Sequence, residues 1–232
     1  MSQMALMAGG SLMNVTDSHP IDPQLLMSFL DDGTSERLEK YFHSGDFTGG
    51  RFEALAGGGD RPEAVNLIDA DDIVAVSLLS VRIPGRAALQ LLKERRDQIS
   101  ELLSEIPADV DLWDTEADTL AAGSEADQLW RLVEGLPGSG WVTAGKLLAR
   151  KRPRLFPVYD RVVHASLQRP KGDSTFWHDL RLALRDNPSA VDRLRALHEE
   201  ASLGNVSLLR TLDVAIWMKS HGEPEPDPPA EA

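Results

Sequence analysis

The spacing of apolar residues between positions 21 and 220 is the feature that most constrains the fold. These residues recur mostly three and four positions apart, and long alternating runs of Val, Ile and Thr are missing. Helical spacing puts apolar side chains on one helix face, whereas strands need alternation, so the sequence predicts an all-α, multi-helix bundle. The length of 232 residues suits a single domain, expected over residues 21–220.

Local start signals place most of the expected helices. Acids open the segment after Asp69, Pro84 suits a first helical position, and Ser124 followed by Asp127 predicts an N-terminal cap. Helices are therefore expected over residues 69–81, 84–96, 125–134, 175–185, 190–201 and 206–219. The glycine-rich segment 48–60 interrupts this pattern, and we interpret it as a flexible connector, with an anion cradle as the alternative.

The two ends and the composition narrow the class of protein. Residues 1–20 lack Lys and Arg and are expected to form a disordered leader, and residues 221–232 form an acidic, proline-rich tail expected to be disordered. The chain has no cysteine, which excludes disulfides and cysteine-bound metals, and it has no apolar run of membrane-spanning length. We expect a cytoplasmic protein without a membrane partner, and its oligomeric state stays open.

A glycine turn between two helical segments is the most informative local pattern. In LPGSGWVTAGKLL, residues 136–148, one helix is expected to end near Gly135 and the next to begin near Trp141. Gly138 and Gly140 permit positive φ and a close approach of the backbone to another molecule. Exposed amides of the turn and of the second helix then offer donors to a phosphate oxygen.

Basic residues follow the turn although the chain carries a net charge of −13. From Trp141 to Arg161 six Lys or Arg side chains stand against one acid, Asp160. A local basic surface on an acidic protein can contact a polyanion, so overall acidity does not exclude nucleic acid. The residues predicted to contact nucleic acid are Gly138, Gly140, Thr143, Lys146, Arg150, Lys151, Arg152 and Arg161.

The region from about Leu129 to Leu167 resembles the helix-hairpin-helix superfamily of base-excision DNA glycosylases. The similar pattern is LPG, a variable residue, Gly, two variable residues and TA, followed by LFPVYD ending at Asp160. The resemblance implies a helix-hairpin-helix at about residues 125–167, DNA as partner, with RNA as an alternative, and Asp160 as the catalytic carboxylate. Over its whole length the chain also resembles a family of actinobacterial proteins with no assigned activity.

Asp160 fits the chemistry that this resemblance implies. Cleavage of an N-glycosidic bond develops positive charge on the sugar, which a fixed carboxylate stabilises. Pro157 suits the first turn of a helix, so Asp160 is expected near that helix's positive end, where ionisation is favoured. The alternatives for Asp160 are a plain helix-start residue or an ion pair with Arg150 or Arg152.

Trp141 and Tyr159 flank the motif and are predicted to line a base pocket. Enzymes of this kind hold their target base out of the stack, often against aromatic side chains. The alternative is that both are ordinary core residues.

One departure from the superfamily pattern limits the activity that is inferred. The lysine that forms a Schiff base in lyase-active members is replaced by Val142, so the sequence predicts a monofunctional enzyme. The resemblance implies no organic cofactor, only an alkali ion, Na⁺ or K⁺, held by the backbone at Leu136, Gly138 and Gly140.

Three functions therefore stay open at the level of the sequence. The first is a monofunctional DNA glycosylase-like protein that hydrolyses the N-glycosidic bond of a modified or damaged base. The second is a noncatalytic helix-hairpin-helix protein that binds nucleic acid, and the third is a regulatory protein-interaction module. The target base, the strand preference and the biological pathway do not follow from the sequence.

Overall fold

The computed structural model describes residues 18–170 and 173–221, and over these residues it contains helices and turns without a strand. The all-α prediction is therefore confirmed. The helices are α1 (Pro23–Ser28), α2 (Thr34–His43), α3 (Ala70–Ser77), α4 (Gly85–Leu89), α5 (Arg96–Glu105), α6 (Glu125–Glu134), α7 (Trp141–Lys151), α8 (Arg161–Ser166), α9 (Phe176–Arg185), α10 (Pro188–Glu200) and α11 (Leu208–His221). Short 3₁₀ helices form η2 (Thr48–Arg51), η3 (Leu55–Gly57) and η5 (Ala117–Leu120), and a π-helical turn forms η4 (Gln90–Glu94).

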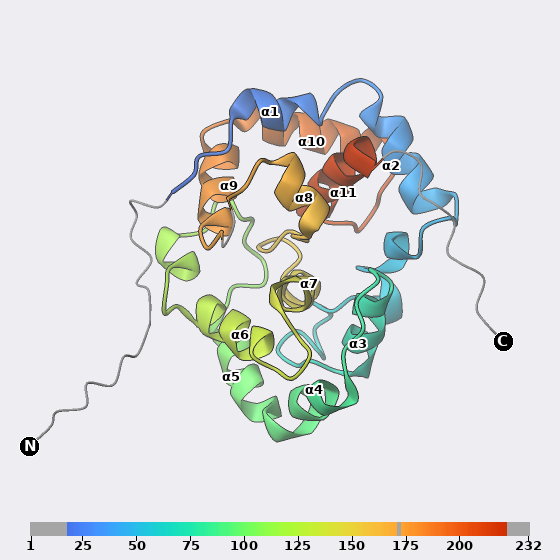
Figure 1. Ribbon diagram of the computed structural model, residues 1–232. Helices are drawn as coiled ribbons and strands as arrows, with labels where there is room; N and C mark the ends of the chain where they lie inside the picture. Colours follow the sequence, from blue (N-terminus) through green and yellow to red (C-terminus); the bar gives the residue numbers. More distant parts are fainter. Residues whose placement is uncertain (1–17, 171–172, 222–232) are drawn as a thin grey trace, which may run out of the picture.

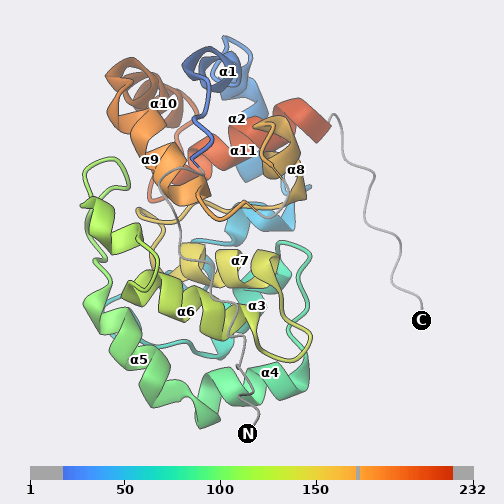
Figure 2. The same cartoon turned by 60° about the vertical axis from the view of Figure 1, so that its left-hand side comes forward.

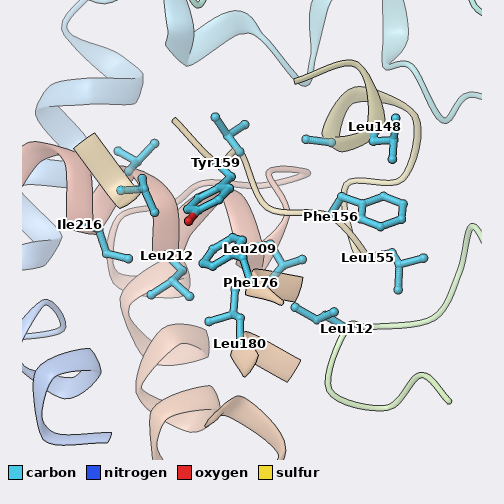
Figure 3. Close-up of a cluster of buried hydrophobic side chains, with 14 of the residues drawn as sticks. Leu112, Leu148, Leu155, Phe156, Tyr159, Phe176, Leu180, Leu209, Leu212 and Ile216 are labelled. Carbon is cyan, nitrogen blue, oxygen red and sulfur yellow. The ribbon is translucent and has the colours of Figure 1, made fainter. Parts of the chain in front are cut away.

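Helix α7 lies at the centre of the molecule (Figure 1). Figure 2 shows α3 to α7 gathered on one side of the described chain and α1, α2 and α8 to α11 on the other. The apolar core is continuous through both groups. Figure 3 shows part of it, where Leu148 of α7 lies near Phe156, while Tyr159 and Phe176 lie near Leu180 of α9 and Leu212 of α11.

Every residue of α7 from Thr143 to Lys151 is buried, including three basic side chains. The carboxylate of Asp72, itself fully buried, explains how two of these basic side chains can be buried. Arg150 donates from Nε to Asp72 Oδ1 (3.1 Å), and Lys151 donates from Nζ to Asp72 Oδ2 (3.0 Å). A buried charge is tolerated only when it is paired and its remaining donors are satisfied, so the other donors need partners as well.

The glycine-rich segment supplies those partners. Carbonyl oxygens of Phe52, Glu53 and Leu55 accept hydrogen bonds from the Arg150 guanidinium at 2.6 Å, and those of Gly59 and Ala64 accept from Lys151. A Cβ at Gly59 would lie 2.3 Å from the Arg150 carbonyl, so only glycine permits this approach. The prediction of a flexible connector over 48–60 is therefore wrong: the segment packs around α7 and holds its cations.

Arg152 is buried in the same way, immediately after α7. Its guanidinium donates to the carbonyls of Val65, Leu103 and Ile106 and to the Asn66 side chain. Burial lowers the pKa of Arg152 to about 10, which still leaves the side chain charged at neutral pH. Arg152 thereby ties the end of α7 to α5 and to the segment before α3.

Several expected boundaries are corrected by the structure. The helix expected to stop at residue 96 continues through η4 into α5, because a π-helical turn absorbs the break. Pro157 lies outside a helix, and α8 begins only at Arg161. Ser18 and His19, expected in the disordered leader, bind Asp179, whereas residues 1–17 and 222–232 of the predicted leader and tail lie outside the described residues.

Asp72→Asn tests whether the buried cations Arg150 and Lys151 depend on Asp72, the anion that they share. Removal of one member of a buried ion pair leaves the others uncompensated, so we expect unfolding in urea to require about 3–5 kcal/mol less free energy. Asp71→Asn is the matched control, because the Asp71 side chain is 51% exposed and its ion pair with Arg61 is long, at 3.4 Å. This substitution should change the free energy of unfolding by less than about 1 kcal/mol. Equal effects of the two substitutions would contradict this account of α7.

Candidate functional site

The turn between α6 and α7 has the expected bend, and Pro137 and Gly138 at its tip are exposed. Gly138 has φ +74°, a conformation that favours glycine, and the Ser139 amide donates to the Leu136 carbonyl (2.9 Å). A Cβ on Gly138 would lie 2.7 Å from Pro84, so the segment that carries Pro84 already occupies the space on one side of Gly138. Gly140 has an extended backbone and requires no glycine.

A cavity of about 450 Å³ lies beside this hairpin, between α6 and α7 on one side and α8 and α9 on the other. Five of its twelve lining residues are Trp, Tyr or Phe, which suits a flat organic ligand, and its volume lies in the range of small-molecule sites. The lining residues are Leu120, Asp127, Trp130, Arg131, Glu134, Trp141, Tyr159, His164, Asp173, Ser174, Phe176 and Trp177.

Trp141 and Tyr159, the two residues predicted for a base pocket, both line this cavity. Their ring centroids are 5.4 Å apart at an interplanar angle of 60°. The Tyr159 ring stacks on Phe176 with centroids 3.7 Å apart (Figure 3), and Trp130 meets Trp177 edge to face at 4.8 Å. Tyr159 is only 4% exposed, so it belongs to the core as well as to the cavity wall.

Charged groups at the cavity are mostly paired. Asp127 accepts from Arg131 Nε through both oxygens (3.0 and 2.9 Å), and Asp173 pairs with Arg169 (2.7 Å) outside the wall. Within the described residues Glu134 has no ion-pair partner. The described wall therefore carries three carboxylates, Asp127, Glu134 and Asp173, against the one guanidinium of Arg131.

A buried network fixes the Tyr159 side of the cavity. The Tyr159 hydroxyl donates to Asp173 Oδ2 (2.6 Å), and Arg169 joins Asp173 to Asp179 (2.5 Å). Burial raises the pKa of Asp173, but hydrogen bonds from Arg169 and Tyr159 outweigh it and hold that pKa below its ordinary value. Asp173 is thus an anion at neutral pH and a strong acceptor for the phenol.

Asp160 is the N-cap of α8 and does not line the cavity. Its Oδ1 accepts from the amides of Val162 (2.9 Å) and Val163 (3.1 Å), and its Oδ2 has no hydrogen bond within the described residues. The expected position at a positive helix end is confirmed, and the alternative of an ion pair with Arg150 or Arg152 is not what the structure contains. Asp160 follows Tyr159 directly, so it lies beside the wall.

Ionisable groups on the other side of Asp160 are buried. Lys146 donates to the Leu79 carbonyl (2.8 Å), and burial lowers its pKa while the charge of Asp160 raises it. Burial also raises the pKa of Asp213 to about 8, with Arg210 opposing and Asp160 adding to the effect. Asp160 itself is partly exposed, and its charge acts on the buried side chains of Lys146 and Asp213.

The predicted surface strip of cations is not present. Arg150, Lys151 and Arg152 are each 1% exposed, and Lys146 is 6% exposed. Their donors bind protein oxygens, so the prediction that they contact phosphates is wrong in this conformation; Thr143 is buried too, and Arg161 alone among the predicted side chains is exposed. The physical reason is that interior carbonyls and Asp72 replace the water that would otherwise hydrate these groups.

The structure gives no support to metal binding at the hairpin. The carbonyls of Leu136 and Gly140 each accept one amide, from Ser139 and Ala144. In the described part of the chain, no group of three or more His, Asp or Glu side chains is arranged to hold a metal ion. The alkali ion stays a prediction.

Comparison with known proteins defines the family. The model of a family of unknown function, DUF6308, matches residues 34–220. The chain belongs to this family. Searches of curated proteins and of solved structures found no match. Among the described residues of this DUF6308 member, no helix combines the length and the apolar character needed to span a membrane.

Sequence reasoning missed the far wall of the cavity. The sequence indicated only that Trp130 and Phe176 face the core, because each falls on the apolar face of an amphipathic helix. Trp177 and Glu134 carried no separate signal. Their assembly depends on contacts between α6 and α9 that no local pattern specifies.

Tyr159→Phe tests whether the cavity wall is fixed by its hydroxyl. The ring and its stacking on Phe176 are kept, but a hydrogen bond to a buried carboxylate is lost, so we expect a loss of about 1.5–3 kcal/mol in urea unfolding. Ser28→Ala, which removes only an exposed bond to the Leu25 carbonyl, is the control and should be nearly neutral. A neutral Tyr159→Phe would show that Asp173 does not hold the ring.

Proposed function

We propose that this protein binds one nucleobase in the aromatic cavity and that it is a monofunctional, DNA glycosylase-like hydrolase of the N-glycosidic bond of a modified base. The observation that carries the proposal is the meeting of Trp141 and Tyr159 in one cavity beside the hairpin and next to Asp160. Flat aromatic walls suit the π face of any base.

The proposed chemistry follows from the placement of Asp160. A base held against Tyr159 would present its sugar on the α8 side, where Asp160 Oδ2 has no hydrogen-bond partner among the described residues. As the bond between C1′ and the base nitrogen breaks, the carboxylate stabilises the positive charge on the sugar. Water then adds its oxygen to C1′, and a proton passes to the departing base. The network of Asp173 and Arg169 keeps the wall in place without entering the reaction.

A second candidate is noncatalytic binding of the base. One observation favours it: Asp160 has a structural task as the cap of α8 and is absent from the cavity wall. The predicted regulatory module has weaker support, since a concave cavity of this size with aromatic walls suits a small ligand better than a protein surface.

Asp160→Asn separates the two candidates. Asparagine caps helices as well as aspartate, so the fold and base binding should persist. Release of base from a panel of modified-base nucleosides and duplexes should fall at least about a hundredfold, as expected for the loss of an electrostatic stabiliser. Asp160→Ala is the companion variant, which should also lose about 1 kcal/mol of stability with the cap.

The measurement is base release resolved by chromatography, with alkali treatment to reveal abasic sites in duplexes. Unchanged release by Asp160→Asn would remove Asp160 from the mechanism. Binding without release by the unsubstituted protein would leave noncatalytic recognition as the function.

A further inference from the structure

Burial makes the outside of this protein more negative than its formal charge suggests. The chain has 24 basic and 37 acidic residues, and in its described part seven basic but only four acidic residues are buried. The buried basic residues are Lys146, Arg150, Lys151, Arg152, Arg169, Arg181 and Arg210. A polynucleotide is bound through many exposed cations, and four of the six basic residues between Trp141 and Arg161 are committed to the interior instead.

The entrance of the cavity repeats this pattern locally. Arg131 is the one cation in the described wall, and its Nε is held by Asp127. Glu134 lies at the same edge, three residues farther along α6, and its carboxylate has no ion-pair partner among the described residues. The Arg131 side chain is 58% exposed, but the described wall sets three carboxylates, Asp127, Glu134 and Asp173, against this one guanidinium, so a phosphate beside the bound base would meet a net negative charge.

The hairpin does not offset this repulsion. In a nucleic-acid-binding turn the backbone at the glycine must come close to a phosphate. Here Pro84 packs against one side of Gly138, and Lys146 binds the Leu79 carbonyl instead of pointing outward. The cation that would hold a strand at this turn is thus engaged within the protein.

We infer that the cavity takes its base from a free nucleoside or a similarly small, phosphate-free molecule, rather than from a nucleic acid strand. This inference rests on the proposed base-binding function and names its ligand class. The volume of about 450 Å³ suits a ligand of this size, and the aromatic walls supply binding that does not depend on phosphate contacts. Glu134 acts in it as a specificity residue that disfavours phosphorylated ligands.

Calorimetric titration of the full chain tests the inference with matched ligands. The panel contains natural and N-methylated nucleosides, their 5′-monophosphates and short single strands and duplexes containing the same bases. At low salt the nucleoside should bind at least about tenfold more tightly than its monophosphate and than the strand. The difference should narrow as salt rises, because the repulsion is screened.

Glu134→Gln identifies the source of the discrimination. It should narrow the ratio between the nucleoside and monophosphate affinities, and this ratio is the readout because Glu134 itself lines the cavity. Glu105→Gln, at the exposed end of α5 and away from the cavity wall, is the control and should leave the gap unchanged.

The outcomes distinguish this inference from the proposed function. If the monophosphate or the strand binds as tightly as the nucleoside or more tightly, the inference is overturned while base recognition stands. The inference is also overturned if Glu134→Gln leaves the difference between nucleoside and monophosphate affinity unchanged. A panel in which nothing binds overturns the proposed function itself. Nucleoside-selective binding that responds to Glu134→Gln supports both.

Discussion

The structure depends on the insertion of the basic C-terminal half of α7 into the interior. Asp72 pairs with Arg150 and Lys151, and carbonyl oxygens from residues 52–64 complete the coordination of both cations. Each cation loses its hydration on burial, which is unfavourable unless every donor finds an oxygen. The chain meets this condition by folding a glycine-rich segment, which would otherwise have little reason to be ordered, around the end of α7.

That anchoring sets the position of the candidate site. With the C-terminal end of α7 held by Asp72, its first residue, Trp141, lies at the cavity, and the chain after α7 returns past Phe156 to Tyr159. Tyr159 is then fixed by Asp173 and by stacking on Phe176 of α9. The same run of sequence therefore supplies the central support of the fold and two walls of the pocket. Its cations serve the first role only.

The sequence correctly predicted those features that depend only on interactions between neighbouring residues. The cap of α6 by Ser124, the positive φ of Gly138 and the position of Asp160 at a helix start need only neighbouring residues, and these three are found. The direction of Arg150 and Lys151 could not be predicted in the same way. A basic side chain on a helix faces water unless distant carbonyls and an acid such as Asp72 replace it, and those partners lie far away in sequence. The far wall of the cavity, with Trp130 and Trp177, depends on packing between helices for the same reason.

The most direct test of the central claim locates the ligand on the protein. The chain has five tryptophans, so indole-labelled protein gives five resolvable N–H signals by NMR, which single Trp→Phe substitutions can assign. On titration with a nucleoside, we expect the signals of Trp130, Trp141 and Trp177 to shift together while Trp113 and Trp217, which lie outside the cavity, stay in place. Binding that shifts Trp113 or Trp217 and leaves the three cavity signals unchanged would contradict the account.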